Sequence, residues 1–241
     1  MLDECDPEER ILAMLLCLIL SSATRDRDCI LATKAIKDAG LLDVGKLAAL
    51  GSEEDLRRLA DIIKPAGIHN NRARQIRDSC RIIRDIYDGK VPFRANDLGR
   101  LPGVGRKVTN LLGGEGFGSF CGIGSDMWVL WLCCCFGWLH RVEGGGALTA
   151  THAEALLRTF VYRWHYNDIN KILGSFGQMF TQIFTVGRGN FDNQAAEYLV
   201  NATLEHIHEP YHLELLFFMI RRCRLLEANL EERRKAKKSR S

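Results

Sequence analysis

The sequence lacks any pair of cysteines in a CxxC arrangement, although it contains nine cysteines in 241 residues. Three of them, Cys133–Cys135, are consecutive and stand in an apolar run, and the total is odd. These features do not indicate a framework of disulfide bonds, so we interpret the cysteines as free thiols in a reducing, intracellular compartment. The histidines also lack the spacing of a zinc site, and we expect neither a bound metal nor a cofactor.

No apolar run is long enough to cross a bilayer. The longest run near the start, Ile11–Leu20, is too short for a spanning helix. The acidic residues before it do not resemble the basic segment of a signal peptide. We therefore expect a protein without a membrane partner.

An excess of positive charge is absent from most of the chain. The formal net charge is +3, but six of the 33 basic residues lie in the segment 233–241, and the other 27 are outnumbered by 30 acidic residues. The bulk charge of the body therefore does not indicate nucleic-acid binding, and any DNA-binding site has to be local. The basic tail is open to two interpretations, a nuclear-address signal or a solvated arm that binds DNA nonspecifically.

Strict alternation of apolar and polar residues, the pattern of a half-buried strand, is missing over any useful length, so the sequence predicts an all-α fold. Apolar residues recur instead at helical spacing. Ser52 stands where a helix N-cap is expected, with Asp55 three residues later. Helices are predicted over Ile11–Leu20, Asp28–Asp38, Ser52–Ile63, Asn71–Tyr87, Met127–Leu139, Ala153–Trp164, Ile169–Phe184 and His212–Leu230, and the glycine-rich stretch Gly113–Gly124 is predicted to be irregular.

The strongest motif is LPGVGRK, residues 101–107, which predicts a sharp turn between two helical segments. Its two glycines permit backbone angles closed to other residues and remove side chains that would block an approaching DNA backbone. Backbone amides of the turn and of the following helix can then point at one phosphate oxygen, whatever the base sequence. The alternative is an ordinary tight turn with Lys107 on a solvated face. The DNA-binding residues expected in the turn are Leu101, Pro102, Gly103, Val104, Gly105 and Arg106.

Together with Val108–Leu112, this segment closely resembles the hairpin of the endonuclease III-like base-excision DNA glycosylases, a helix-hairpin-helix family. Other segments resemble the same family in the same order along the chain. Residues 20–26 (LSSATRD) resemble its leucine-serine-serine-glutamine-threonine-lysine-aspartate segment, and residues 63–76 resemble its glycine turn and following helix. Phe176–Gln178 resembles the segment that leads into its iron–sulfur loop. The resemblance extends from Ile11 to Thr181 and is far more specific than the hairpin alone.

The resemblance implies a nucleophile at Lys107 and a catalytic aspartate at Asp126, about twenty residues further on. A carboxylate beside the sugar stabilises the positive charge that develops as the glycosidic bond breaks. An amine can attack the anomeric carbon and form a Schiff base, which opens a route to strand cleavage. Asp126 can also cap the helix that follows it, and the two roles are compatible. A wedge near Ser22, Ala23 and Thr24 is further implied, to fill the gap that an extruded base leaves.

The sequence departs from the family pattern at three places. Ala23 replaces a glutamine and cannot hydrogen-bond an orphaned base. Trp128 and Trp131 stand where the family has a histidine and an arginine; they could be core residues or could change how the DNA or the hairpin is supported. Thr181 occupies the first of four cysteine positions that often hold an iron–sulfur cluster, and only Cys223 lies beyond it, so no cluster is expected. A leading helix of the family is also expected to be missing.

These observations predict a two-lobed all-α helix-hairpin-helix glycosylase fold with DNA in a groove between the lobes. The predicted domains are 1–125, with the hairpin motif at about 94–113, then 126–204, and finally 205–241 with a helix and the basic tail. The implied function is removal of damaged bases, oxidised pyrimidines by resemblance, followed by β-elimination at the abasic site. The alternatives are a glycosylase for a mismatched or alkylated base, and a non-catalytic protein that keeps only the hairpin. The expected partner is double-stranded DNA with damaged bases or abasic sites, bound by a monomer.

Overall fold

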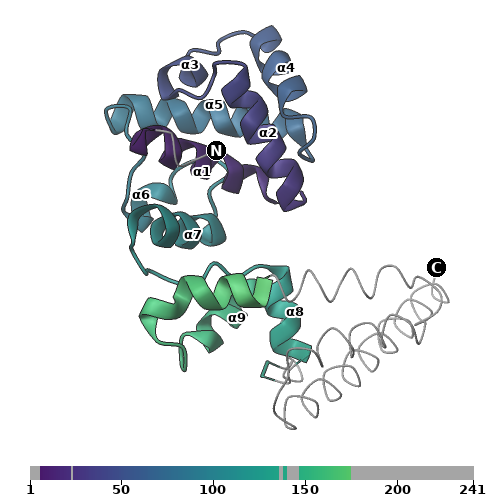
Figure 1. The fold of residues 1–241 in the computed structure, drawn as a ribbon, viewed down its shortest axis with the longest axis vertical. Helices are drawn as coiled ribbons and strands as arrows, with labels where there is room; N and C mark the ends of the chain where they lie inside the picture. The colour runs from purple at the N-terminus through teal and green to yellow at the C-terminus, as the bar shows by residue number, and fades with distance from the viewer. Residues whose placement is uncertain (1–5, 23, 136–137, 140–146, 175–241) are drawn as a thin grey trace, which may run out of the picture. The chain divides into compact units, whose positions relative to one another are not determined.

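The computed structural model describes residues 6–22, 24–135, 138–139 and 147–174; the predicted helix His212–Leu230 lies outside these ranges. Throughout them the regular structure is helical and no strand occurs, which confirms the all-α class (Figure 1). Within the same ranges, no helix has both the length and the apolar character that crossing a membrane requires.

The chain divides into two compact units. Of the described residues, the first contains those up to Gly124 together with Arg163–Asn167, and the second contains those within 125–162 together with 168–174. The predicted domains 126–204 and 205–241 extend past the described residues and stay predictions. The helices of the first unit are α1 (Pro7–Leu20), α2 (Asp26–Asp38), α3 (Val44–Ala48), α4 (Glu53–Ile62), α5 (His69–Ile86), α6 (Ala95–Leu98), α7 (Arg106–Phe117) and the short 3₁₀ helix η1 (Arg163–His165).

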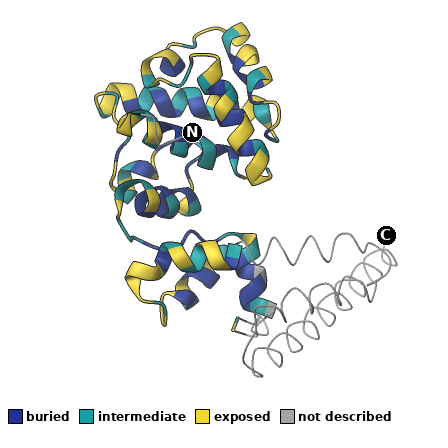
Figure 2. Cartoon of the chain, viewed as in Figure 1, coloured by how far each residue is buried: buried dark blue, intermediate teal, exposed yellow. Residues whose placement is uncertain are grey.

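Helix α1 is the centre of the first unit and packs against α2, α5 and α7. The buried residues gather where these helices meet (Figure 2). The helix begins earlier than predicted because the Asp6 carboxylate accepts a hydrogen bond of 3.1 Å from the Glu8 N–H, and because Pro7 suits a first helical position. Four of its apolar side chains are completely buried: Leu15, Leu16, Ile19 and Leu20.

Helices α3, α4 and α5 form the other side of this core, with α5 packed against both α3 and α4. The predicted cap of α4 is confirmed, because the Ser52 hydroxyl accepts from the Asp55 N–H at 3.0 Å and the Asp55 carboxylate accepts from the Ser52 N–H at 3.1 Å. Helix α3 was not expected from the sequence, because five residues are too few to show a helical period.

The expectation that Gly113–Gly124 is irregular is wrong in its first part, because α7 continues to Phe117. Packing explains why glycines stand inside this helix despite their low helix propensity. A Cβ atom on Gly114 would collide with the side chain of Asn167, and one on Gly116 would lie 3.1 Å from Ile11 Cδ1. The helix ends at Gly118, whose φ of +62° is the left-handed conformation common after helix C-termini.

In the second unit, α8 (Met127–Cys135) packs against α9 (Ala150–Leu157). Helix α8 ends before the predicted Leu139, whose N–H donates to the Cys133 carbonyl at 3.1 Å in a closing turn. The prediction of a helix over Ala153–Trp164 is wrong at both ends. Helix α9 starts at Ala150, because the Thr149 N–H donates to His152 Nδ1 at 3.0 Å in an N-terminal capping arrangement. Residues 166–174 are helical, and the rest of the predicted helix Ile169–Phe184 lies outside the described part.

Candidate functional site

The predicted DNA-binding turn connects α6 to α7 in the first unit. The Leu101 N–H donates to the Leu98 carbonyl at 3.0 Å, and the Val104 N–H donates to the Leu101 carbonyl at 3.0 Å. The side chains of Leu101 and Val104 are buried in the core of this unit, whereas Gly105 and Arg106 are exposed. The two apolar residues therefore anchor the turn, and the segment from Gly105 onward is the part that solvent reaches.

Position 103 requires glycine for two reasons, its backbone conformation and the side chains packed around it. Its φ is +81°, a conformation that residues with a side chain rarely adopt. A Cβ atom there would lie 2.9 Å from Gln75 Oε1 and 3.2 Å from Ile19 Cγ2. Gly105 differs, since a Cβ atom on it would meet nothing within 4 Å. The space beside Gly105 is therefore open to a ligand.

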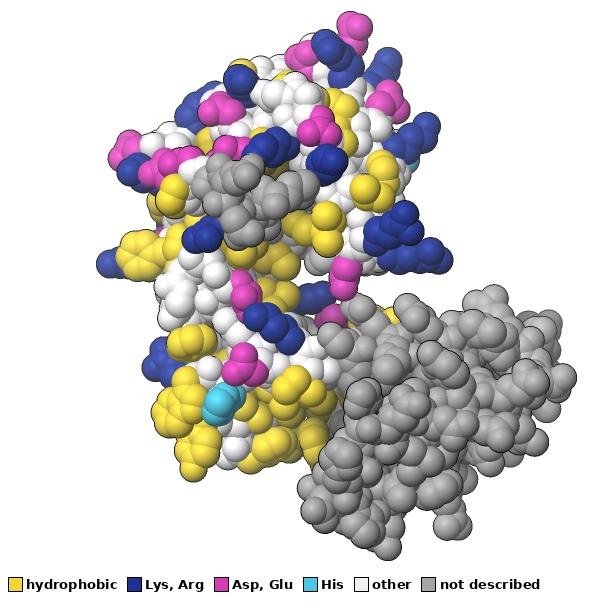
Figure 3. All heavy atoms as spheres, in the orientation of Figure 1, with side chains coloured by type: hydrophobic (Ala, Val, Ile, Leu, Met, Phe, Trp, Pro, Cys, Tyr) yellow, Lys and Arg dark blue, Asp and Glu magenta, His cyan; other side chains and the backbone are white. Residues whose placement is uncertain are grey.

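Gly105 is also the N-cap of α7, and no side chain caps the helix at this residue. The N-terminus of a helix carries a partial positive charge and suits an anion. Lys107 lies in the first turn of α7 and is half-buried. Charge of one sign does not dominate the visible face of the first unit, where basic and acidic side chains are interspersed (Figure 3). The hairpin thus presents a helix N-terminus suited to an anion on a surface of mixed charge.

Lys107 lies close enough to Cys29 of α2 to act on it electrostatically. Burial raises the pKa of the Cys29 thiol to about 12, neighbouring negative groups including Asp26 add to that rise, and the positive charge of Lys107 opposes it. The first turn of α7 therefore lies near the N-terminal part of α2. At neutral pH the Cys29 thiol is protonated and is a poor nucleophile beside Lys107.

The predicted wedge segment is also in the first unit, directly after α1. Thr24 Oγ1 accepts a hydrogen bond of 3.1 Å from the Gly67 N–H, and it donates to the Ser22 carbonyl at 3.4 Å. Ser22 is exposed and Thr24 is half-buried, and Ala23 lies outside the described residues. The structure therefore joins this segment to the turn that precedes α5.

Ile68 belongs to that turn and was not singled out from the sequence. It has a φ of 57°, which is unusual for a β-branched residue, and its side chain is 59% exposed. The preceding Gly67 is the residue that bonds Thr24. An apolar side chain is thus presented to solvent beside the wedge segment. No sequence pattern predicts a left-handed backbone conformation for Ile68, although the sequence does show that this residue stands shortly before a predicted helix.

Helix α5 connects the wedge segment with the hairpin through residues that sequence reasoning missed. Arg72, Gln75 and Ser79 lie along one side of the helix, at spacings of three and four. The Ser79 hydroxyl donates to the Pro102 carbonyl at 2.8 Å, and Arg72 Nη2 donates to the Ser22 carbonyl at 3.4 Å. Arg72 and Ser79 are both buried. The sequence gives no local signal of this, because arginine and serine are ordinarily exposed residues.

Asp126 belongs to the second unit, and its predicted capping role is confirmed. Its Oδ1 accepts hydrogen bonds from the Trp128 N–H at 2.9 Å and from the Val129 N–H at 3.1 Å, at the start of α8. Asp126 and Trp128 are half-buried, and the side chain of Trp131 lies outside what the structure describes. The cap fixes the Asp126 carboxylate at the helix N-terminus, where a negative charge is favoured.

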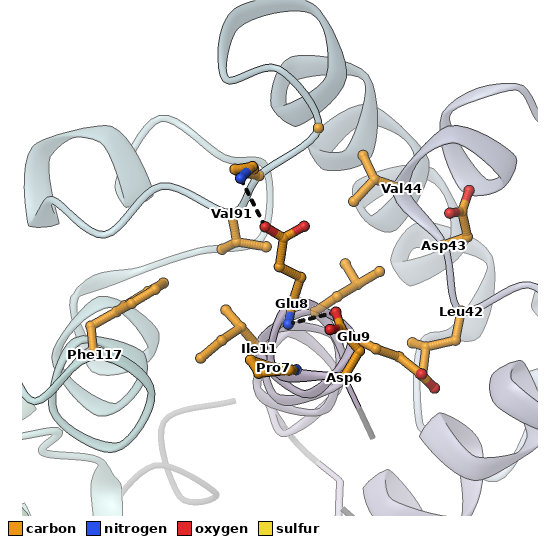
Figure 4. A pocket seen from close by; sticks show the side chains of 13 residues that line it. Asp6, Pro7, Glu8, Glu9, Ile11, Leu42, Asp43, Val44, Val91 and Phe117 are labelled. Carbon is orange, nitrogen blue, oxygen red and sulfur yellow. Dashed lines mark hydrogen bonds and ion pairs between the residues drawn. The ribbon is translucent and has the colours of Figure 1, made fainter. Parts of the chain in front are cut away.

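A hollow of about 500 Å³ lies in the first unit, around the N-terminal end of α1 (Figure 4). Its lining combines apolar side chains such as Ile11, Val91 and Phe117 with carboxylates, and Lys90 Nζ lies 3.0 Å from Glu8 Oε1. None of the predicted catalytic or DNA-binding residues lines it. The predicted site residues of the hairpin and the wedge segment are thus separate from this hollow.

No group of three or more metal-ligating side chains occurs among the residues that the structure describes. The expected absence of an iron–sulfur cluster concerns Thr181 and Cys223, which lie outside those residues. It stays a prediction.

Residues 16–172 match the HhH-GPD superfamily of base excision DNA repair proteins. The chain belongs to this family. Among curated relatives, endonuclease III homolog 1, chloroplastic, of Arabidopsis thaliana is 30% identical over 72% of this chain and 45% of its own length. Endonuclease III-like protein 1 of Mus musculus is 27% identical over 71% of this chain and 54% of its own length. This HhH-GPD chain thus spans about half the length of the curated relatives it matches.

Solved structures of the same fold are similar over most of this HhH-GPD chain. A trapped endonuclease III–DNA covalent intermediate superposes with a TM-score of 0.58 at 24% identity, over 66% of this chain and 70% of that chain. A thermostable thymine-DNA glycosylase gives a TM-score of 0.54 at 22% identity, over 71% of this chain and 74% of that chain. These likenesses establish the helix-hairpin-helix glycosylase fold that the sequence predicts.

Proposed function

We propose that this protein is a base-excision DNA glycosylase with abasic-site lyase activity, and that Lys107 is its nucleophile. One observation carries the proposal: α7 starts at Arg106, its N-cap Gly105 stands beside open space without a side-chain cap, and the first turn of the helix holds Lys107. This arrangement stands in a chain whose family repairs DNA by base excision. The partner is double-stranded DNA, bound by a monomer.

The hairpin supplies the grip on the DNA backbone. A phosphate at the start of α7 is attracted by the helix dipole and meets no side chain at Gly105. Arg106 is exposed and adds a positive charge next to that position. Contacts of this kind are independent of base sequence, which suits an enzyme that searches DNA for rare lesions.

The wedge consists of Ser22, Ala23 and Thr24 together with Ile68. A damaged nucleotide has to leave the duplex before a protein group reaches its sugar, and an apolar side chain can fill the gap and stabilise the distorted stack. Ile68 is exposed, apolar and held in an uncommon backbone conformation, and it directly follows Gly67, whose N–H donates to Thr24. It therefore provides the volume that Ala23 lacks at the position of the family's glutamine.

Lys107 and Asp126 perform the chemistry in this proposal. The Lys107 nitrogen attacks C1′ of the damaged nucleotide, and the bond from C1′ to the base breaks with its electron pair leaving on the base. The Asp126 carboxylate stabilises the developing positive charge and accepts a proton from the attacking amine. Asp126 passes its proton to the ring oxygen as the sugar opens, which gives a Schiff base between C1′ and the Lys107 nitrogen. Solvent then takes a C2′ proton, a C2′–C3′ double bond forms, and the bond from C3′ to oxygen breaks so that the 3′ phosphate leaves with the electron pair. Water finally releases Lys107.

Oxidised pyrimidines are the proposed substrates, and the proposed compartment is intracellular and, in a eukaryote, the nucleus. The alternatives are a mismatched or alkylated base, or binding without catalysis. The first experiment incubates the protein with a labelled duplex that contains one abasic site, in the presence of borohydride. A covalent protein–DNA adduct supports the lyase. Duplex binding without any adduct would favour the non-catalytic alternative, and a panel of lesion-containing duplexes separates the substrates.

A further inference from the structure

Arg72 is a buried cation without a negatively charged partner among the described residues. Arg72 is only 7% exposed, and the acceptors of its described hydrogen bonds are neutral oxygens. Nη1 donates to Gln75 Oε1 at 2.7 Å and Nη2 donates to the Ser22 carbonyl at 3.4 Å, whereas Nε has no partner within the described part of the chain. Burial lowers the pKa of this guanidinium, which nevertheless stays protonated.

Such an arrangement contributes little to stability. Removing a charge from water costs free energy, and a cation with only neutral partners does not regain it fully. A well-packed apolar side chain of similar length would serve the core as well or better. Burial of a charge at this position therefore points to a role other than stabilising the fold.

The contacts of Arg72 lead from the wedge segment to the hairpin. One arm of the guanidinium holds the backbone carbonyl of Ser22. The other arm holds Gln75 Oε1, the atom that lies 2.9 Å from where a Cβ atom of Gly103 would stand. The planar guanidinium fixes the angle between its two arms, which a flexible ammonium cannot do.

We infer that Arg72 is a positioning residue that ties Ser22 to the hairpin through Gln75, so that Ser22 and the phosphate-binding turn contact the duplex at a fixed distance from each other. The inference rests on the proposed function and deepens it. Extruding a nucleotide requires the phosphate to be held while the wedge enters the stack, and a displacement of about 1 Å between the two can cost on the order of 10²-fold in rate.

The test measures base unstacking apart from the chemistry. The probe is a duplex with a tetrahydrofuran abasic analogue and a 2-aminopurine base opposite it, whose fluorescence rises when the stack opens. Arg72→Met is expected to reduce this fluorescence change severalfold, while its melting temperature and the salt dependence of duplex binding stay close to those of the wild type. Single-turnover cleavage of an abasic duplex is expected to slow by about tenfold or more, with little change in affinity.

Arg81→Met is the matched control, since Arg81 also belongs to α5 and also donates to backbone carbonyls, those of Ala48 and Leu50, at 3.1 and 3.0 Å. It is expected to leave unstacking unchanged. Arg72→Lys is expected to resemble Arg72→Met, because an ammonium keeps the charge but not the fork. Full activity of the lysine variant, or equal losses in both methionine variants, would overturn the inference.

The outcomes also separate this inference from the proposed lyase. If the wild type forms no borohydride adduct, but Arg72→Met and not Arg81→Met abolishes unstacking, the lyase proposal fails and the positioning role stands. If the wild type forms the adduct and Arg72→Met leaves unstacking unchanged, the lyase proposal stands and the positioning role fails. Duplex binding by the wild type without any fluorescence change would contradict the positioning role directly.

Discussion

The Ser79 hydroxyl of α5 donates a hydrogen bond of 2.8 Å to the Pro102 carbonyl of the hairpin. Ser79 is completely buried, and Pro102 has no N–H of its own with which to anchor the turn. This bond therefore links the position of the hairpin to the core helix below it, and it connects two segments more than twenty residues apart in the sequence.

Replacing Ser79 with alanine tests that link. We expect Ser79→Ala to lower the free energy of unfolding by about 1–3 kcal/mol, because the Pro102 carbonyl loses its donor in a partly buried place. Affinity for a duplex is expected to fall severalfold. Ser52→Ala is the control, since it removes the cap of α4, costs about 1 kcal/mol and leaves the hairpin alone. Equal losses of affinity in the two variants would show that stability, not the hairpin, determines binding.

The two glycines of the hairpin are predicted to fail in different ways when they become alanine. Gly103→Ala meets both a positive φ and the Gln75 side chain, so we expect a loss of about 1–2 kcal/mol or more in stability together with weaker binding. Gly105→Ala fits the fold without a clash, so stability should stay nearly constant while affinity falls. Thermal melting and duplex binding measured on both variants check this. Wild-type affinity in Gly105→Ala would mean that no phosphate approaches this residue.

Asp126 combines a cap with a proposed catalytic charge, and substitution can separate them. Asparagine is as good a helix cap as aspartate, so Asp126→Asn is expected to change stability little. Single-turnover base excision should fall by roughly 10²-fold or more, because the developing positive charge loses its carboxylate. Asp126→Ala loses both functions and is expected to be less stable as well. Near-normal excision by the asparagine variant would limit Asp126 to its structural role.

The basic tail is predicted to add affinity without selectivity. Each phosphate contact contributes a slope of roughly −0.9 to a log–log plot of duplex binding against salt. Deleting residues 233–241 should therefore reduce the steepness of that slope by the contribution of a few phosphate contacts at most, since the segment contains six basic residues. Turnover at saturating enzyme should hardly change. An unchanged salt slope would favour the transport-signal interpretation, and a lower single-turnover rate would place the tail at the active site.

Local chemistry explains which parts of this fold the sequence could predict. The cap formed by Ser52 and Asp55 involves neighbours in the sequence, and the run Ile11–Leu20 is apolar enough to identify a central helix. The glycines of α7 were misjudged because their helix propensity is poor, and only the close approach of Asn167 and Ile11 explains them. Tertiary contacts of this kind carry no local signal.

In the candidate site, too, only the residues that act through local chemistry were predictable from the sequence. The turn at residues 101–107 and Lys107 were predictable from motif and spacing, because glycines and a basic pair have direct backbone and charge consequences. Arg72 was not, because arginine is ordinarily an exposed residue and its hydrogen bond to the Ser22 carbonyl joins positions fifty residues apart. Ile68 was not either, since its left-handed conformation is imposed by the turn around it.

Borohydride trapping of Lys107→Gln on an abasic duplex tests the central claim most directly. Arg106→Gln is the matched control, because it removes the neighbouring positive charge from the same helix turn and leaves the proposed nucleophile in place. We expect no covalent adduct with Lys107→Gln at an enzyme concentration that still saturates the duplex, and a clear adduct with both the wild type and Arg106→Gln. An undiminished adduct with Lys107→Gln would contradict the account, since another amine would then be the nucleophile.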